Sequence, residues 1–149
     1  MSGPTMNVGV SWKGGRRYEV SQGSAATIVL DGERVAGPGP VATLLGALAS
    51  CSAMDIVDYL EKRRTPVTRM DIAVSGVRNA TVPQRVLSAR LEFAIDGDGI
   101  EAEHAERSIA RACGTYCSVA ATRAPDVEIA TRLVLNGVAR EDVMHPRSP

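Results

Sequence analysis

Three cysteines are the residues of this 149-residue chain whose types and spacing could do chemistry. Cys51 lies in an apolar stretch, and Cys113 and Cys117 lie four residues apart in a later segment. Three is an odd number and too few for a disulfide scaffold. In a chain with no secretory signal, paired cysteines are more often catalytic or metal-binding than structural. The pairing of these thiols therefore decides what they can do.

The CxxxC pair by itself is a weak site. Two cysteines at i and i+4 of a helix have Cβ vectors unsuited to an unstrained disulfide. A zinc site needs four ligands, and His104 and His145 are the only histidines. His104 lies about 180° and 220° around a helix from Cys113 and Cys117, which predicts a solvated residue at the helix start. A CxxxC metal site stays a third interpretation, to be tested by metal analysis.

Cys51 by itself favours packing, because free cysteine is among the most buried residue types. Ser50 and Ser52 supply hydroxyls beside it, and Asp55 lies one turn further on the same helix face. A carboxylate there raises the pKa of a thiol unless a cation intervenes. A reactive Cys51 therefore needs an arginine partner.

Cys51 paired with Cys117 or Cys113 across two packed helices would give the thiols a joint function. A thiolate that attacks an O–O bond becomes a sulfenic acid, and a nearby thiol condenses with it to a disulfide that an external dithiol reduces. This is the chemistry of a two-cysteine peroxidase, which the spacing permits but does not select. The sequence contains no GxxxxGK[ST], GxGxxG, GxSxG or HExxH motif for nucleotide, hydrolase or zinc-protease chemistry.

The elements that must position these cysteines are predicted to form an α+β fold, in the order β-β-β-α-β-β-α-β without βαβ alternation. Strands are expected at 7–12, 16–21, 25–31, 67–78, 85–95 and 127–135, and helices at 41–64 and 101–123. The first helix is expected to be buried on nearly all sides at its start. We expect one domain over 1–149, with residues 138–149 as a flexible tail.

Composition excludes several classes of partner. Lys+Arg and Asp+Glu both number 17, so the zero net charge gives no case for nucleic acid or an acidic membrane surface. The uncharged run 35–54 falls short of the about 20 continuous apolar residues of a membrane span, which predicts a core helix and a cytoplasmic protein. With 3% aromatic residues, a pocket would be aliphatic and suited to a small or alkyl substrate.

The stretch Gly37–Asp55, GPGPVATLLGALASCSAMD, resembles the first-helix motif of the OsmC/Ohr family. Tyr116–Val119, YCSV, resembles the second cysteine motif of that family, and the element order over about 7–136 matches as well. The resemblance implies an OsmC-like fold, with antiparallel β-sheets and two long central helices. It also implies an intertwined homodimer with active sites at the subunit interface.

On this resemblance Cys51 is the peroxidatic cysteine and Cys117 the resolving one, while Cys113 is an extra packing residue. The family's better-known members reduce organic hydroperoxides with an external thiol reductant, in some of them a lipoylated protein. They carry no metal and no organic cofactor. The expected function is therefore a thiol-dependent peroxidase for small apolar hydroperoxides. The alternative is a non-catalytic ligand-binding or stress-response dimer whose cysteines stay reduced.

One departure from the family pattern concerns the charge beside the cysteine. In the better-known members, an acidic residue about ten positions before the peroxidatic cysteine holds an arginine that lowers the pKa of the thiol. Here that region reads Val41–Thr43 and has no acid. Arg16 aligns best with the arginine, Arg17 is its neighbour, and the alternative for either is an ordinary charge at a strand end. Asp55 is a candidate replacement for the missing carboxylate.

Overall fold

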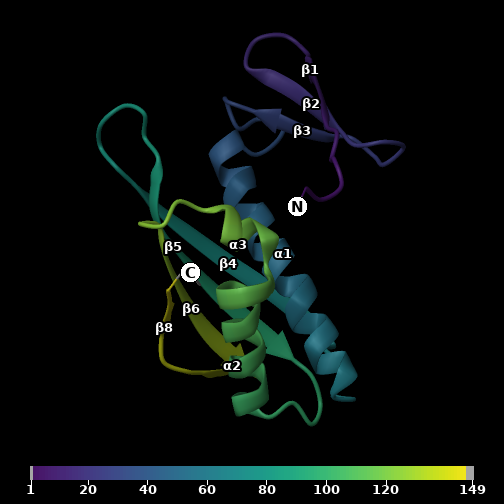
Figure 1. The fold of residues 1–149 in the computed structure, drawn as a ribbon, viewed down its shortest axis with the longest axis vertical. Helices are drawn as coiled ribbons and strands as arrows, with labels where there is room; N and C mark the ends of the chain where they lie inside the picture. Colours follow the sequence, from purple (N-terminus) through teal and green to yellow (C-terminus); the bar gives the residue numbers. More distant parts are fainter. Residues whose placement is uncertain (1, 147–149) are drawn as a thin grey trace. The chain divides into compact units, whose positions relative to one another are not determined.

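Strands in two runs and two helical segments build the chain, as Figure 1 shows. The computed structural model describes residues 2–146 and divides into two units after residue 44. The α+β class predicted from the sequence is confirmed. The single domain and the intertwined dimer stay predictions.

The first unit contains a three-stranded antiparallel sheet in the order β1-β2-β3. Its strands begin and end within three residues of the predicted bounds: β1 Gly9–Trp12, β2 Arg17–Ser21 and β3 Ile28–Asp31. Gly14 and Gly15 adopt positive φ angles of 98° and 56°, which allow the turn between β1 and β2. The indole Nε1 of Trp12 donates to the Gly15 carbonyl at 3.0 Å, while the residue stays 66% exposed.

Asp31 ends β3 and organises the loop that follows it. Its Oδ1 accepts from the Glu33 amide at 2.9 Å, and its Oδ2 accepts from the Ala36 and Val35 amides at 3.0 and 3.3 Å. These donors, Ala36 first, hold the pKa of Asp31 below its usual value. Arg17 Nη2 lies 3.6 Å from Oδ2. A buried carboxylate therefore shapes the 31–40 loop, which the sequence patterns left undefined.

The second unit is built on a five-stranded sheet in which β4, β5 and β6 are neighbours in that order. Strands β7 and β8 both pair antiparallel with the other edge of β6. The bounds are β4 Arg69–Arg78, β5 Val86–Asp96, β6 Glu128–Leu135, β7 Val138–Ala139 and β8 Val143–His145. The helices are α1 Pro40–Lys62, α2 Ala102–Arg111, the π-helix η1 Ala112–Tyr116 and α3 Ser118–Thr122.

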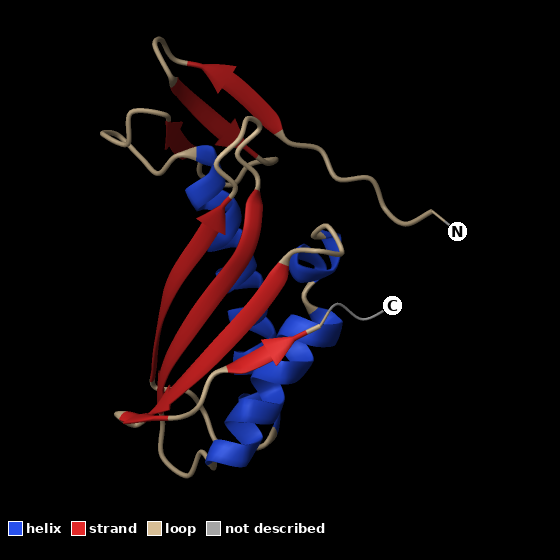
Figure 2. Ribbon diagram, turned by 90° about the vertical axis from the view of Figure 1, so that its left-hand side faces the viewer, coloured by secondary structure: helices blue, strands red, loops and turns tan. Residues whose placement is uncertain are grey.

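The helices of the second unit lie on one face of its sheet, which Figure 2 shows from the side. The core forms between them. Phe93 of β5 is fully buried and lies opposite Ile72 of β4 and beside Leu133 of β6. Alternate residues on the outer face carry charges, where Arg90 pairs with Asp142 at 2.8 Å. The alternation in β5 and β6 thus separates an apolar inner face from a polar outer face.

Three predictions about this unit are wrong. β5 and β6 pair in parallel through the α2 crossover, so the sheet is mixed and contains one βαβ connection. The predicted helix 101–123 is interrupted by η1 and ends at Cys117 before α3 begins. The predicted tail contains β7 and β8, in which His145 is buried against β6; residues 147–149 lie outside the described part of the chain.

The first helix is less enclosed at its start than predicted. Leu48 and Ala49 are buried, but Gly46 and Ser50 beside them are exposed. In the described part of the chain, α1 is the one helix long and apolar enough to cross a membrane, with a hydropathy of 1.6. Its inner side lies in the hydrophobic core, and 22% of its most apolar stretch is buried. A cytoplasmic location stays a prediction.

Candidate active site

Three different elements bring the cysteines to one region of the second unit. Cys51 lies midway along α1, Cys113 lies in η1, and Cys117 is the residue between η1 and α3. All three are free thiols. Cys113 and Cys117 are each 1% exposed and belong to the core, whereas Cys51 is half-buried and packs against it. Cys51 is therefore the most accessible of the three.

A π-turn sets the position of Cys117. The Cys117 amide donates to the Ala112 carbonyl at 2.9 Å, a hydrogen bond that spans five residues. Cys117 then leaves the helical conformation, with ψ at 112°, and its Sγ accepts from the Ala120 amide at 3.3 Å. Single π-turns within α-helices often occur at functional sites. Here the turn ends η1 and makes the Cys117 sulfur the N-cap of α3.

Cys51 and Cys117 are neighbours that come from two helical segments. Burial raises the pKa of Cys117 above its ordinary value, and the Ser52 hydroxyl and the Ala120 amide partly oppose this rise. The neighbouring Cys51 side chain raises the pKa of Cys117 further. The structure thus brings together the two cysteines that the resemblance paired, although their roles stay predictions.

Cys113 is buried one turn before Cys117. Its Sγ donates to Ser52 Oγ at 3.7 Å. Burial raises the pKa of Cys113 to about 11, against the opposing effect of the Ser52 hydroxyl. Cys113 therefore stays a protonated thiol at neutral pH, which supports its interpretation as a packing residue rather than a nucleophile.

The family to which this arrangement belongs follows from comparison with known proteins. The family model for OsmC-like proteins matches residues 31–132. The chain belongs to the OsmC-like protein family. The family resemblance seen in the two cysteine motifs is therefore confirmed.

Relatives of this OsmC-like chain agree with that assignment. Protein YhfA of Escherichia coli K12 is 28% identical over 116 residues, which cover 77% of this chain and 87% of YhfA. An OsmC-like protein from Mycoplasma pneumoniae has the same fold, with a TM-score of 0.75, 16% identity and coverage of 89% and 97% of the two chains. An organic hydroperoxide resistance protein OsmC from Legionella pneumophila gives a TM-score of 0.61, 14% identity and coverage of 89% and 98%.

The arginine predicted to assist Cys51 lies in the first unit of this OsmC-like chain. Arg16 is exposed, and its Nε lies 3.8 Å from Glu33 Oε1. Its neighbour Arg17 approaches the buried Asp31 instead. Both contacts lie within the first unit, so a role for Arg16 beside Cys51 stays a prediction.

Two charges reach the cysteine cluster from within the second unit. The Asp55 carboxylate raises the pKa of Cys113, and the Arg123 guanidinium lowers it. Arg123 is held by the Ala120 carbonyl at 2.7 Å and the Val127 carbonyl at 3.0 Å. Arg123 is not predicted from the sequence, because nothing in its spacing from Cys117 marks it as a neighbour of Cys113.

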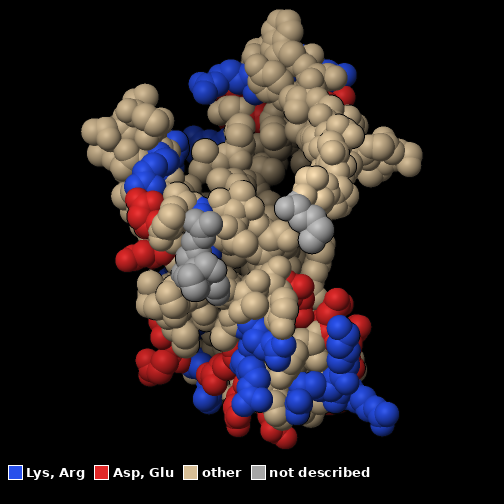
Figure 3. All heavy atoms as spheres, in the orientation of Figure 1, with Lys and Arg blue, Asp and Glu red and all other residues tan. Residues whose placement is uncertain are grey.

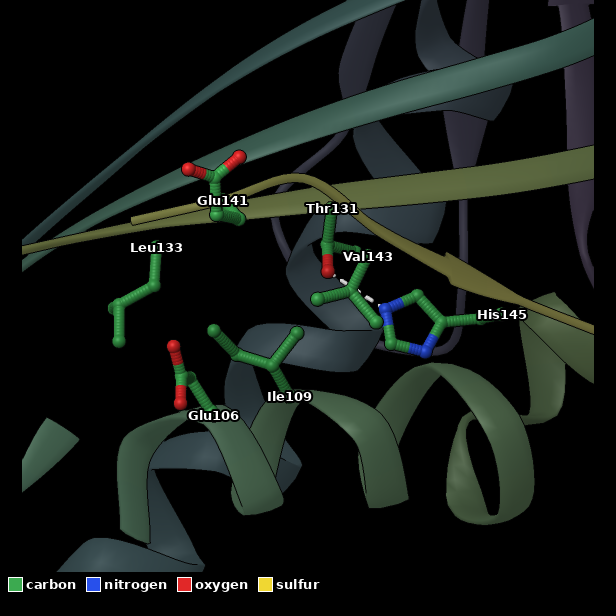
Figure 4. A pocket seen from close by; sticks show the side chains of 7 residues that line it. All are labelled: Glu106, Ile109, Thr131, Leu133, Glu141, Val143 and His145. Atoms are coloured by element: carbon green, nitrogen blue, oxygen red, sulfur yellow. Dashed lines mark hydrogen bonds between the residues drawn. The ribbon is translucent and has the colours of Figure 1, made fainter. Parts of the chain in front are cut away.

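A small hollow lies apart from the cysteines, between α2, β6 and the β8 segment (Figure 4). Its lining residues are Glu106, Ile109, Thr131, Leu133, Glu141, Val143 and His145. His145 Nε2 lies 2.6 Å from Thr131 Oγ1. Burial first, and then the charge of Arg123, lower the pKa of His145. This hydrogen bond fixes β8 against the sheet.

The histidines do not join the cysteines in a metal site. Within residues 2–146, no three His, Cys, Asp or Glu side chains are placed to hold a metal ion. His104, which was predicted to be solvated, has a side chain only 21% exposed. Its Nε2 accepts from Arg63 Nη2 at 2.8 Å, and its Nδ1 lies 3.4 Å from Glu101.

Proposed function

We propose that this OsmC-like chain is a thiol-dependent peroxidase that reduces organic hydroperoxides, with Cys51 as the peroxidatic and Cys117 as the resolving thiol. The contact between these two thiols from different helical segments carries the proposal. Cys51 is the more accessible member of the pair, as a thiol that meets an external substrate must be. Cys117 is buried directly beside it, as a thiol that reacts only within the protein can be.

The proposed cycle needs only the two thiols and a reductant. The Cys51 thiolate attacks the O–O bond of ROOH, takes up one oxygen as sulfenic acid and, with one proton, releases the alcohol ROH. Cys117 sulfur then displaces the sulfenic oxygen, which leaves as water with the Cys117 proton, and a Cys51–Cys117 disulfide forms. An external dithiol reduces this disulfide and is itself oxidised. No metal or organic cofactor takes part.

The surroundings of the pair suit an apolar hydroperoxide. The core that holds Cys113 and Cys117 is largely aliphatic and includes Leu48, and Leu45 and Val119 pack against it. On the face in Figure 3, Lys, Arg, Asp and Glu gather mainly over the lower halves of α1 and α2 rather than over α3. The Legionella relative is named for organic hydroperoxide resistance, which agrees with an alkyl substrate.

The family pattern extends the proposal to three further features. Arg16 is proposed to stabilise the Cys51 thiolate and to polarise the peroxide, since a guanidinium lowers the pKa of a neighbouring thiol. The working form is proposed to be a cytoplasmic homodimer. The reductant is proposed to be an external dithiol, such as a lipoylated protein.

Treatment with one equivalent of cumene hydroperoxide, followed by peptide mass spectrometry, tests the cysteine pair. The wild-type chain is expected to form a Cys51–Cys117 disulfide, and C113S is the matched control because it keeps both members of the pair. C51S is expected to form none and to lose hydroperoxide turnover in a stopped-flow assay with alkyl hydroperoxide and hydrogen peroxide. Full turnover by C51S would refute Cys51 as the peroxidatic thiol. Three thiols that stay reduced in the wild type would refute the peroxidase and favour the non-catalytic binding protein.

A further inference from the structure

Ser52 is a buried hydroxyl beside the cysteine pair. It follows Cys51 on α1 and is 0% exposed. Two other serines on the helices donate to the backbone: Ser50 Oγ to the Ala47 carbonyl at 3.3 Å, and Ser108 Oγ to the Ala105 carbonyl at 2.7 Å. Within residues 2–146, Ser52 makes no such bond to a helix carbonyl. A buried hydroxyl without a hydrogen-bond partner destabilises the folded state, so we ask which groups hydrogen-bond Ser52 instead of a helix carbonyl.

The partners of Ser52 are two thiols from the other helical segment. Cys113 Sγ donates to Ser52 Oγ at 3.7 Å. The Ser52 hydroxyl is also close enough to Cys117 to lower the pKa of that thiol. One hydroxyl therefore lies between the two buried cysteines.

The direction of these bonds follows from the protonation of Cys113. A serine hydroxyl has one hydrogen to donate and two lone pairs that accept. Because Cys113 is a thiol at neutral pH, it fills a lone pair of Ser52 and leaves the Ser52 hydrogen for another acceptor. Cys117 is within reach of that hydrogen, and its thiolate would otherwise be held by the Ala120 amide.

We propose that Cys113, Ser52 and Cys117 form a hydrogen-bond chain in which Ser52 is a positioning residue that directs its hydroxyl hydrogen onto the Cys117 sulfur. Cys113 acts in this chain as the donor that orients Ser52. This rests on the proposed function, in which Cys117 must lose its proton to resolve the Cys51 sulfenic acid. This hydrogen-bond chain speeds disulfide formation by Cys117 without contacting the peroxide.

Three other groups lie near this hydrogen-bond chain and act on its thiols electrostatically. Cys51 and Asp55 face it from α1, and Arg123 from the segment after α3. Asp55 and Cys51 oppose a second negative charge in the cluster, whereas Arg123 favours one. These groups are unchanged when Ser52 or Cys113 is substituted. A shift of the Cys117 pKa in those variants therefore reports on the hydrogen-bond chain.

The first measurement follows the two steps of the reaction separately. In single-turnover experiments with cumene hydroperoxide, S52A is expected to form the Cys51 sulfenic acid at the wild-type rate. Its disulfide is expected to form about tenfold more slowly, because a hydrogen bond to a charged group shifts a pKa by about one unit. The pH profile of the disulfide step should move upward by the same amount. S50A is the control, since the exposed Ser50 donates only to the helix backbone.

The second measurement requires no peroxide chemistry. In a C51S chain labelled with 13C at the cysteine β-carbons, NMR titration follows the Cys117 pKa directly. S52A and C113A should raise it, while C113S and S52T should restore it, because serine and threonine keep the donor. An unaltered Cys117 pKa in both S52A and C113A would overturn the proposed hydrogen-bond chain, even if the peroxidase proposal holds. A raised Cys117 pKa in S52A and C113A, together with no sulfenic acid formation by the wild-type protein, would support the hydrogen-bond chain and refute only the peroxidase.

Discussion

The amide of Cys117 donates to the carbonyl of Ala112 across five residues, at 2.9 Å, where an α-helix would join residues four apart. This bond closes the π-turn that contains Cys113 and ends at Cys117. The position of both buried thiols relative to Ser52 and Cys51 therefore depends on the number of residues in one turn.

Deletion of Thr115 tests this dependence. Thr115 is exposed and lies inside η1, so its removal should convert the π-turn to an α-turn and rotate Cys117 by about 100° around the helix. We expect loss of the Cys51–Cys117 disulfide, while circular dichroism shows unchanged helix content. T115A keeps the residue count and should form the disulfide at the wild-type rate. A deletion variant that still forms the disulfide would show that the π-turn does not position Cys117.

The C117S variant separates attack from resolution. With no resolving thiol, the Cys51 sulfenic acid should persist on the order of tenfold longer after exposure to an alkyl hydroperoxide, because its internal partner is gone. Trapping with dimedone and mass spectrometry measures the adduct at Cys51. Equal decay of the sulfenic acid in C117S and the wild type would remove Cys117 from the mechanism.

The buried Thr131–His145 pair predicts a loss of stability in acid. Because the pKa of His145 is lowered in the folded chain, the unfolded chain binds this proton more readily. The contribution of His145 to the free energy of unfolding is therefore complete above its ordinary pKa of about 6.5, and it is lost as the pH falls below that value. Urea unfolding at about pH 7.5 and about pH 5 should show this slope. H145Q should flatten it.

Thr131→Val probes the same pair without removing the titrating group. The loss of the 2.6 Å hydrogen bond leaves a buried imidazole without its partner, which should lower the free energy of unfolding by about 1–3 kcal/mol. Urea unfolding at neutral pH measures the effect. A value equal to wild type would show that the bond contributes nothing to the docking of β8.

Phe93 is the largest fully buried side chain of the second unit. Phe93→Ala should lower the free energy of unfolding by about 3–5 kcal/mol, because it leaves a cavity between the sheet and the helices. Val77→Ala on β4, where Val77 is 61% exposed, should change it by less than about 0.5 kcal/mol. Similar values for the two variants in urea unfolding would contradict this description of the core.

Sequence patterns predicted the strands well and their partners poorly. The strands predicted at 85–95 and 127–135 agree with β5 and β6 to within one residue at each end, since a strand pattern depends only on the local chain. The parallel pairing of these strands depends on where α2 returns the chain, which no local pattern encodes. β7 and β8 are two and three residues long, too short for alternation to be visible.

The cysteine site, like the fold, was predicted from the sequence only in part. The apolar periodicity of α1 placed Cys51 on a packed helix, but the residues alone left Cys113 and Cys117 as equal partners for it. The family resemblance selected Cys117. The inward position of Ser52 depends on how η1 packs against α1, and η1 itself is invisible to helical periodicity because Gly114 and Thr115 interrupt no pattern.

The chain's one tryptophan, Trp12, is on β1, and its indole hydrogen bond is to Gly15 in the same hairpin. Intrinsic tryptophan fluorescence is therefore a spectroscopic reporter for the N-terminal sheet, whereas far-ultraviolet circular dichroism is dominated by helices that lie mostly in the second unit. Superimposable denaturation curves from the two signals would indicate one cooperative transition. Separate midpoints would reveal a folding intermediate in which one sheet survives the other.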